Sequence, residues 1–548
     1  MTNEPVTLSG EGLTIADLVR VARHGAPVRI TDDPAVRNRI EKSRRIIMAA
    51  VDAGAAIYGV TTAFGGMSNV RVPSDAAAAL QKNIAWPHKT GTGPLLPEAD
   101  VRAAMLLRAS SLTRGVSGVR PEIIQRLIDA INGGLTPHVH EMGSIGASGD
   151  LVPLAYILGA VVGLDPAFRV TLDGQELGAT DALDRLGLPP IELTAKEGLS
   201  VMNGTSVMTG IAALNIHDLR TLTALTLGAH ALIFQGIRAS NGAFHPFISR
   251  HKPHPGQVRA ADLMRDLLDG SALVRDELSG SPRDNGDDLA QDRYALRCLP
   301  QYLGPVLDSL STAASRITVE MSAATDNPLV DPETGDYRYC GNFLGQYVGV
   351  AMDALRRDIA MMAKHLDVQI GFLVAPEFNN GLPASLVGNP DRPVNIGLKG
   401  LQITANSMMP LLLFYGNGLV DRYPTHAEQF NQNINSQGFG AATLARKSVE
   451  IFREYVAAAL IFGVQAADLR THQRHGHYDA RKTMSPATVP LYEAVRDAVG
   501  VPPDPQRPYI RNDDEQALDL HIQRIAESIR SEGAVAGAVE AVGARLEM

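Results

Sequence analysis

The tripeptide Ala147-Ser148-Gly149 could make a reactive group from its own backbone. Gly149 carries no Cβ, so its amide nitrogen is unhindered and can attack the carbonyl carbon of Ala147 where the turn is compressed. Loss of water then closes a five-membered ring. Loss of the Ser148 hydroxyl as a second water leaves an exocyclic methylene, an electrophile that none of the twenty side chains supplies. Taken alone, the tripeptide is more typical of a tight turn before a helix with Asp150 as its N-cap.

Other familiar catalytic and metal-binding patterns are missing from the sequence or incomplete. The glycines around Ser148 have the spacing GxxGxxG, which differs from the GxGxxG of a dinucleotide site. The same serine lies in Gly-Ala-Ser-Gly, which is not the GxSxG turn of serine hydrolases. Three histidines are interleaved with arginines, which is more typical of a solvated helix end than of a metal site: His472, His475 and His477. We therefore predict no metal.

The composition is that of an ordinary folded protein. The chain has 548 residues, of which 45% are hydrophobic and 20% charged, and its formal charge of -9 gives no electrostatic reason to bind nucleic acid or acidic lipid. Cys298 and Cys340 are far apart, which excludes a disulfide framework and a cysteine zinc site. The N-terminus does not resemble a secretory signal, and the longest uncharged run, 400–420, is too polar for a lipid-facing helix. We expect a cytoplasmic protein.

The elements that would hold the tripeptide fall into three regions. Residues 1–205 are rich in residues that break helices and predict a compact region of mixed structure. Residues 206–480 contain long amphipathic stretches, and residues 481–548 predict a C-terminal helical segment. Apolar residues recur with the helical period over 355–373 and 445–460, which predicts two long helices. We therefore expect a mainly α fold with a long-helix bundle as its core.

The tripeptide lies in one of seven separated motifs that together resemble a known enzyme family. These motifs are Tyr58-Gly-Val-Thr-Thr-Ala-Phe-Gly-Gly66, Gly143-Ser-Ile-Gly-Ala-Ser-Gly-Asp-Leu151, Val201-Met-Asn-Gly-Thr205, Gln291-Asp-Arg-Tyr-Ala-Leu-Arg297, Thr325-Asp-Asn-Pro328, Gly341-Asn-Phe343 and Ala427-Glu-Gln-Phe-Asn-Gln-Asn-Ile-Asn-Ser436. The chain is similar, over nearly its whole length, to the ammonia-lyases and aminomutases that use a 4-methylideneimidazol-5-one (MIO) group. That family includes histidine, phenylalanine and tyrosine ammonia-lyases, and the likeness is greatest to bacterial phenylalanine enzymes of the cyanobacterial type.

The resemblance implies the fold, the prosthetic group and the assembly. The fold would be histidase-like and mainly α. The MIO group would form autocatalytically from Ala147, Ser148 and Gly149, without an external cofactor. The protein would be a homotetramer whose subunits share the active sites, and its partner would be a small-molecule aromatic amino acid.

The resemblance also assigns roles to individual residues. Tyr58 would be the base that takes the β-proton, and its pKa, about 10 in an ordinary phenol, must be lowered for this, which helix N-termini pointing into the site would do. Arg297 would clamp the substrate carboxylate with its planar guanidinium. Lys399 would lie near the site, or would otherwise be a surface cation. The remaining positions expected around the MIO group and the substrate are Leu199, Asn203, Gln291, Tyr294, Asn327, Phe343, Glu428 and Gln432, the last two near the amine.

The two residues after Trp86 resemble the substrate switch of the family but match none of its usual pairs. Phenylalanine enzymes typically have Phe-Leu there, tyrosine enzymes His-Leu and histidine enzymes Ser-His, whereas this chain has Pro87-His88. Gln432 stands where histidine enzymes carry a glutamate, which disfavours histidine as the substrate. We expect phenylalanine or a ring-substituted relative such as tyrosine, with His88 donating to a para or meta oxygen. Alternatively, Pro87 turns His88 out of the pocket.

Three functions follow from the resemblance. An aromatic amino acid ammonia-lyase would release ammonia and a trans-cinnamate-type product. A 2,3-aminomutase would retain that product and return the nitrogen to the β-carbon. Ala63 replaces a glycine that many relatives have in the tyrosine loop, and since loop mobility is thought to separate the two activities, the choice stays open. A non-catalytic helical protein would keep the tripeptide intact, which an intact-mass measurement would reveal.

Overall fold

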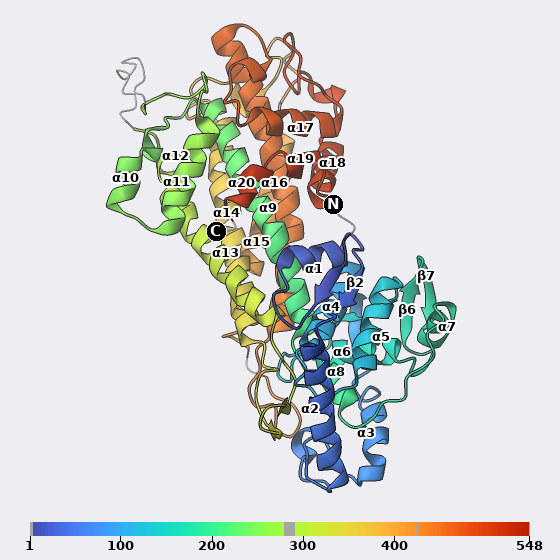
Figure 1. The fold of residues 1–548 in the computed structure, drawn as a ribbon. Coiled ribbons are helices and arrows are strands. Elements are labelled where there is room, and N and C mark those ends of the chain that lie inside the picture. The colour runs from blue at the N-terminus through green and yellow to red at the C-terminus, as the bar shows by residue number, and fades with distance from the viewer. Residues whose placement is uncertain (1–3, 279–290, 424, 547–548) are drawn as a thin grey trace. The chain divides into compact units, whose positions relative to one another are not determined.

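The fold is mainly helical, as the sequence predicted (Figure 1). The computed structural model describes residues 4–278, 291–423 and 425–546. The longest helices of this described part are α9 (Ser206–Ile237), α13 (Leu299–Met321), α14 (Gln346–Val374) and α16 (Gly438–His475). The described strands are short and pair only within small sheets of two or three strands.

The chain folds into two compact units, each assembled from segments that are far apart in the sequence. Unit 1 comprises Met1–His217, Ala313–Asp353 and Gly418–Arg446, and unit 2 comprises Asp218–Thr312, Ala354–Asn417 and Lys447–Met548. The four longest helices each contribute residues to both units. The division into 1–205, 206–480 and 481–548 follows chain order instead, and it stays a prediction.

Unit 1 contains helices α1 to α8 and all the described strands. Its helices are α1 (Ile15–Ala22), α2 (Pro34–Asp52), α3 (Ala77–Asn83), α4 (Glu98–Thr113), α5 (Pro121–Asn132), α6 (Leu151–Val161), α7 (Ala179–Arg185) and α8 (Glu197–Met202). The strands are β1 (Val6–Leu8), β2 (Val28–Ile30), β3 (Thr92–Leu95), β4 (Thr136–Pro137), β5 (His140–Met142), β6 (Arg169–Leu172), β7 (Gln175–Gly178), β8 (Leu329–Asp331) and β9 (Asp336–Arg338). β1 and β2 are parallel, and the other pairs, β3–β5, β4–β6–β7 and β8–β9, are antiparallel.

A small core in unit 1 fixes the segment that carries Tyr58. Helix α2 begins with Pro34 at its first turn, where the missing N–H is no loss, and the Asp33 carboxylate accepts from the Ala35 N–H at 2.8 Å. Toward its other end, buried α2 side chains pack with Ile57 and Val60, which are fully buried. Because Ile57 and Val60, on either side of Tyr58, are held in this core, packing sets the position of Tyr58.

Unit 2 contains the remaining helices and the C-terminal segment. Besides its parts of the four longest helices, it holds α10 (Pro246–His251), α11 (Pro255–Leu268), α12 (Tyr294–Arg297), α15 (Lys399–Tyr415), α17 (Val489–Val499), α18 (Leu518–Arg530), α19 (Ala534–Gly537) and α20 (Glu540–Ala544). The predicted apolar face of α14 is confirmed, since Leu355, Ile359, Met362, Leu366, Ile370 and Leu373 are all buried. Helix α14 thus buries one face, whereas α9 and α16 are buried on nearly all sides over 222–237 and 455–471.

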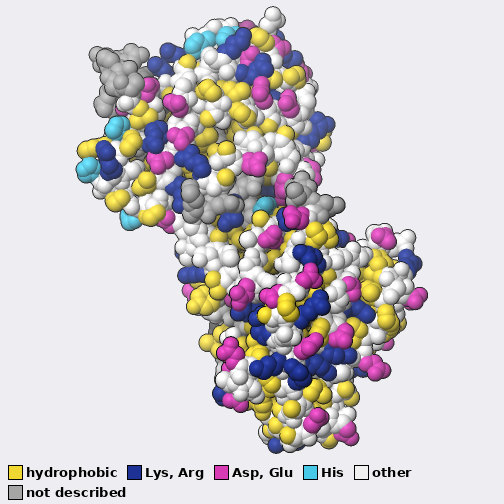
Figure 2. All heavy atoms as spheres, in the orientation of Figure 1, with side chains coloured by type: hydrophobic (Ala, Val, Ile, Leu, Met, Phe, Trp, Pro, Cys, Tyr) yellow, Lys and Arg dark blue, Asp and Glu magenta, His cyan; other side chains and the backbone are white. Residues whose placement is uncertain are grey.

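The surface carries charges of both signs. Figure 2 shows Lys and Arg side chains interspersed with Asp and Glu over the face in view, in keeping with the modest net charge. Among the described residues, no helix combines the length and the apolar character needed to cross a membrane.

Candidate active site

A cavity of about 360 Å³ in unit 1 brings together residues from six of the seven separated motifs. Predicted site residues form most of its lining: Tyr58, His88, Ala147, Ser148, Leu199, Asn203, Asn327, Phe343, Glu428 and Gln432. The others in the lining are Phe64, Ile84, Leu151, Gly341, Leu344, Asn431 and Ile434. The cavity therefore places a phenol, the tripeptide and aromatic and aliphatic side chains around one space.

The tripeptide forms a turn that only glycine can complete at its third position. Gly149 has φ +69°, and a Cβ built on it would lie 2.1 Å from the carbonyl oxygen of Gly204. The two glycines pair as a parallel bridge, and the N–H of Asp150 donates to the same Gly204 oxygen at 2.8 Å. The backbone around Gly149 is therefore held in a left-handed conformation that suits a compressed turn.

Polar side chains from two other segments contact Ser148. The carboxamide nitrogen of Asn203 donates to the Ser148 carbonyl oxygen at 3.0 Å, and that of Gln432 donates to the Ser148 hydroxyl oxygen at 3.2 Å. If the tripeptide cyclised, the Ser148 carbonyl oxygen would take up negative charge, and the Ser148 hydroxyl would leave as water. The donor set and the glycine-only turn thus fit the residues expected to form an MIO group.

Asp150 occupies the N-cap position of α6, but its carboxylate serves a different helix. It accepts from the N–H groups of Val207 and Met208, at 3.0 and 2.8 Å, in the first turn of α9, and from the Ser144 hydroxyl. Burial raises the pKa of Asp150 to about 7, although these hydrogen bonds and nearby Arg108 lower it. The carboxylate therefore ties the segment after the tripeptide to the start of α9.

Tyr58 lies in the cavity, but its surroundings in unit 1 differ from the expectation. Its hydroxyl oxygen accepts from the N–H of Gly65 at 2.9 Å, at the start of a short 3-10 helix, Gly65–Met67. Burial nevertheless raises the pKa of Tyr58, this hydrogen bond lowers it by less, and the negative charge of Glu428 raises it further. The expected lowering by helix N-termini is thus not realised by the residues of this unit.

Gln81, which was not among the predicted site residues, joins two parts of the site. Its carboxamide nitrogen donates to the Gly59 carbonyl oxygen at 2.8 Å, and its carboxamide oxygen accepts from the Leu199 N–H at 2.9 Å. The side chain is fully buried and fully paired. It therefore fixes the tyrosine loop against helix α8, which leads to Asn203. The available signal was the place of Gln81 in the segment directly before the substrate switch.

The Pro87-His88 pair forms the centre of a turn that presents the histidine to the cavity. The Lys89 N–H donates to the Trp86 carbonyl oxygen at 3.1 Å, with proline at the position where its fixed φ favours a turn. His88 lines the cavity, whereas Pro87 is exposed and does not. The alternative that Pro87 turns His88 away is therefore not what the structure shows.

The orientation of His88 changes its expected role. Its Nδ1 lies 2.8 Å from the carbonyl oxygen of Ile84. Because a carbonyl oxygen only accepts, Nδ1 carries a hydrogen, and the neutral imidazole has Nε2 as an acceptor. The sequence analysis expected His88 to donate to a ring oxygen, whereas the neutral ring in this position accepts.

Four predicted site residues belong to unit 2 and do not line this cavity. Gln291 and Arg297 line a separate cavity of about 290 Å³, and the Arg297 guanidinium lies 4.6 Å from the ring centre of Tyr294, which is 72% exposed. Lys399 is exposed at the start of α15, as in the surface-cation alternative. Their part in binding the substrate stays a prediction.

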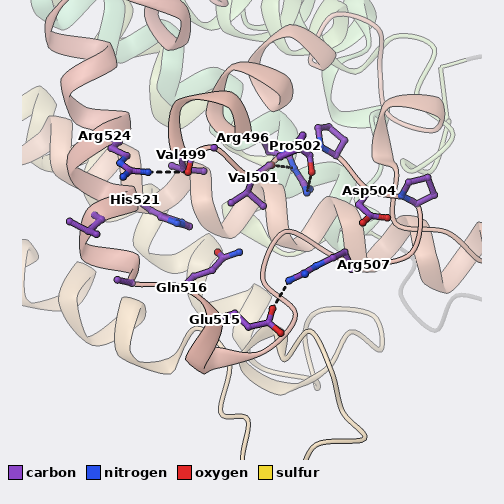
Figure 3. A pocket seen from close by; sticks show the side chains of 15 residues that line it. Arg496, Val499, Val501, Pro502, Asp504, Arg507, Glu515, Gln516, His521 and Arg524 are labelled. Carbon is purple, nitrogen blue, oxygen red and sulfur yellow. Dashed lines mark hydrogen bonds and ion pairs between the residues drawn. The ribbon is translucent and has the colours of Figure 1, made fainter.

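Unit 2 also holds a larger cavity, of about 680 Å³, whose arginines are already engaged (Figure 3). The guanidinium of Arg496 donates to the carbonyl oxygens of Val501 and Pro502, Arg507 pairs with Glu515, and Arg524 donates to the Val499 carbonyl oxygen. Its lining has no counterpart of the tyrosine and the Ala-Ser-Gly turn that share the unit 1 cavity. Neither cavity resembles a metal site, and among the described residues no cluster of His, Cys, Asp and Glu could hold a metal ion.

Comparison with known proteins decides the family. The family model described as "Aromatic amino acid lyase" matches residues 13–497. The chain is 57% identical over 542 residues to the phenylalanine ammonia-lyase of Nostoc punctiforme, covering 99% of this chain and 95% of that protein. The chain belongs to the aromatic amino acid lyase family. This confirms the resemblance and the prediction of a carbon–nitrogen lyase.

Other relatives agree with this assignment. An aromatic ammonia-lyase of Loktanella atrilutea is 48% identical over 99% of both chains. The crystal structure of a tyrosine aminomutase from Streptomyces globisporus, 28% identical, matches the fold with a TM-score of 0.86 over 99% of both chains. The histidase-like, mainly α fold is confirmed.

Proposed function

We propose that this protein eliminates ammonia from L-phenylalanine or a ring-substituted relative such as tyrosine, giving a trans-cinnamate-type product, through an MIO group formed from Ala147, Ser148 and Gly149. The observation that carries the proposal is the cavity that Tyr58 and Ser148 share with aromatic and aliphatic side chains. Full-length identity of 57% to a phenylalanine ammonia-lyase supports it. We also propose a cytoplasmic location and no external cofactor.

The residues of this chain would divide the work as follows. The MIO group would supply an electrophile for the substrate amine, which makes nitrogen a better leaving group. Tyr58 would take the β-proton on its hydroxyl oxygen, while Phe64, Leu199 and Phe343 surround the apolar part of the substrate and exclude water. Glu428 would lie near the amine. Because unit 1 raises the pKa of Tyr58, the lowering that catalysis needs must come from groups outside the described residues of that unit.

Cyclisation of the tripeptide is tested by mass. The purified wild-type protein should weigh less than its sequence by the mass of two waters, and Ser148→Ala should abolish both that loss and the activity. A panel of Phe, Tyr, His and substituted phenylalanines, with chromatographic identification of the products, tests the reaction. A wild-type protein with full mass and no product from any aromatic amino acid would sink the proposal.

The position of His88 favours a ring that carries a hydroxyl group. With Nδ1 bonded to Ile84, Nε2 accepts a hydrogen bond from a phenol but not from a plain or methylated ring. We expect kcat/KM for L-tyrosine relative to para-methylphenylalanine, a control of similar size without a donor, to fall roughly tenfold in His88→Leu. Equal ratios in wild type and variant would remove His88 from substrate selection.

An aminomutase is the alternative reaction. It is favoured by structural likeness to tyrosine aminomutase and by Ala63, whose N–H donates to the Val70 carbonyl oxygen at 2.9 Å in a loop also closed by a Thr62–Arg71 bridge. A loop held in this way would retain the product longer. A β-amino acid as the main product would establish the mutase, and free ammonia in equal amount to the enoate would establish the lyase. Histidine stays the least favoured substrate because of Gln432.

Sharing of active sites in a homotetramer would explain why the carboxylate clamp is not in unit 1. Arg297 and its neighbours Gln291 and Tyr294 belong to unit 2, whereas Ser148 lies in the unit 1 cavity. Light scattering tests the tetramer. Co-expression of Ser148→Ala with Arg297→Met, each inactive alone, should restore part of the activity if subunits share sites, and none if each site is built from one chain.

A further inference from the structure

Arg108 is a buried cation whose hydrogen bonds do not go to a carboxylate. It lies on α4 and is fully buried. Its Nη1 donates to the Asn203 carbonyl oxygen at 2.9 Å, and its Nη2 donates to the hydroxyls of Ser111 and Thr325 at 2.6 and 3.3 Å. Nε has no partner among the described residues. Burial lowers the pKa of Arg108 to about 10, so the guanidinium still carries its charge at neutral pH.

The peptide that Arg108 holds is the one that contacts the tripeptide. Asn203 accepts from Arg108 with its backbone oxygen and donates to the Ser148 carbonyl oxygen with its side chain, at 3.0 Å. A Cβ built on Gly204 would lie 2.1 Å from the Arg108 Nη1. The Gly204 oxygen in turn accepts from Asp150, directly after Gly149. The guanidinium is therefore packed against the backbone that forms one wall of the turn.

A packing role alone does not account for a cation at this position. Removing a guanidinium from water costs several kcal/mol unless a carboxylate pairs with it, and an apolar side chain of similar volume would avoid that cost. The carboxylates whose charges favour the Arg108 cation, Asp326 and Asp150, form no hydrogen bond with it among the described residues. The positive charge is thus left to act on the peptide and on the tripeptide beyond it.

We propose that Arg108 is a positioning residue for formation of the MIO group, acting through Asn203. It holds the Asn203 backbone oxygen, so that the carboxamide stays directed at the Ser148 carbonyl oxygen, and its charge favours negative charge on that oxygen. The inference rests on the proposed function, because it requires that the tripeptide cyclises.

The chemistry shows where this help is needed. A bond forms between the Gly149 nitrogen and the Ala147 carbonyl carbon, and the Ala147 oxygen leaves as water with the hydrogens of the Gly149 and Ser148 amides. The Ser148 Cα then loses its proton, and the electron pair moves onto the Ser148 carbonyl oxygen. The pair returns to form the Cα–Cβ double bond as the hydroxyl leaves, which with the lost proton makes the second water. Asn203 donates to the oxygen that carries the charge.

The unit offers a matched control in Arg126. This arginine is 6% exposed and also donates to backbone carbonyl oxygens, those of Val161 at 3.0 Å and Pro189 at 2.6 Å. Burial lowers its pKa as well. Neither of its acceptors contacts the tripeptide, so Arg126→Met removes a buried, backbone-bound guanidinium of the same kind without touching Asn203.

The experiment follows the intact mass of full-length protein over time after synthesis in a cell-free system. We expect Arg108→Met to lose the two waters roughly tenfold or more slowly than wild type, Arg108→Lys to lie between them, and Arg126→Met to match wild type. In an Asn203→Ala background, Arg108→Lys should slow the loss no further, because the residue acts through Asn203. Circular dichroism and gel filtration establish that each variant is folded.

The outcomes separate this inference from the proposed function. If wild type never loses two waters, the proposed function fails. If wild type loses them and folded Arg108→Met or Arg108→Lys does so at the same rate, only the role of Arg108 fails. Equal slowing in Arg126→Met would mean that any buried arginine of the unit matters, which would also overturn the inference. Should Arg108→Met not fold, Arg108→Lys and its double variant with Asn203→Ala still decide the question.

Discussion

Arg108 in unit 1 and Arg496 in unit 2 are both almost completely buried, and their surroundings are opposite. Arg496 in unit 2 donates to the Asp468 carboxylate at 2.5 Å and to two carbonyl oxygens, with its Cζ 5.4 and 5.5 Å from the ring centres of Tyr492 and Tyr509. Arg108 in unit 1 has two hydroxyls and one peptide oxygen, and its Nε is unpaired. Arg496 is thus paired with a carboxylate, whereas Arg108 forms no hydrogen bond with one among the described residues.

The difference separates buried charge that stabilises a fold from buried charge that prepares a site. Asp468 also accepts from the Tyr492 hydroxyl and the Tyr509 N–H, so the pair closes a network that joins α16, α17 and the loop after it. Nothing in that network faces a reacting group. Around Arg108, Asn203 leads to the tripeptide and Thr325 lies in the loop that carries Asn327, while Ser111 is on the same helix as the arginine. Substitutions in the two sites should therefore affect different quantities.

The largest effect on stability should come from breaking the ion pair between Arg496 and Asp468. Arg496→Met leaves Asp468 buried without its cation, which should lower the free energy of unfolding by about 3–5 kcal/mol. Urea unfolding measures this loss. The folded fraction should still weigh less by two waters, because no member of the pair contacts the tripeptide.

Arg524→Met is the control for that variant. Arg524 lines the same cavity but is exposed, and its guanidinium donates a hydrogen bond to the Val499 carbonyl oxygen at 3.1 Å. It should change the stability by less than about 1 kcal/mol. Comparable losses in both variants would contradict the view that the Arg496–Asp468 ion pair is the stabilising element in this part of unit 2.

A second effect should appear as acid sensitivity of unit 2. His365 donates to the Ala295 carbonyl oxygen, its ring lies 4.6 Å from that of His230, and burial lowers its pKa from 6.5 to about 4. Burial lowers the pKa of His230 as well. The unfolded histidine binds a proton below pH 6.5 and the folded one does not. The stability that this contributes is therefore present above pH 6.5 and is lost as the pH falls toward 4.

His365→Gln tests that sign. Glutamine keeps a donor for the Ala295 carbonyl oxygen but takes up no proton, so the fall in the free energy of unfolding between pH 6.5 and 4 should shrink by about 3 kcal/mol. Denaturant titrations at several pH values measure the slope. An unchanged slope would mean that other groups cause the acid sensitivity.

The smallest effect should come from removing one hydrogen-bond partner of Arg108. Ser111→Ala removes one acceptor from the Arg108 Nη2, which keeps Thr325. We expect a loss of about 1 kcal/mol in the free energy of unfolding and complete loss of two waters in the purified protein. Incomplete mass loss in Ser111→Ala would show that Thr325 alone does not keep the Arg108 guanidinium in place for formation of the MIO group.

The sequence predicted the long helices well because their apolar period is visible without any partner. The face of α14 from Leu355 to Leu373 repeats with the helical period and is buried as expected. The tripeptide, Tyr58 and Gln432 were predicted from motifs that resemble those of the family. One cavity holds them together, and their catalytic roles stay predictions.

The sequence did not reveal the residues that hold these groups in place. Gln81 and Arg108 are polar residues on helices, a pattern that ordinarily indicates a solvent-facing side. Their partners lie far along the chain, Leu199 at a separation of 118 residues and Asn203 at 95. Whether a polar side chain on a helix is buried depends on what packs over it, and that is a property of the folded chain.

The sequence by itself supplied the atoms for the proposed chemistry, because an unhindered glycine nitrogen and a serine hydroxyl stand next to each other in Ala147-Ser148-Gly149. The tertiary structure decided the environment of that chemistry. It directed Nδ1 of His88 to a carbonyl oxygen and raised the pKa of Tyr58, where a lower value was expected. It also placed the Arg108 guanidinium, without a carboxylate partner, against the Asn203 carbonyl oxygen. Burial and hydrogen bonding set protonation and orientation, and both depend on neighbours that only folding brings together.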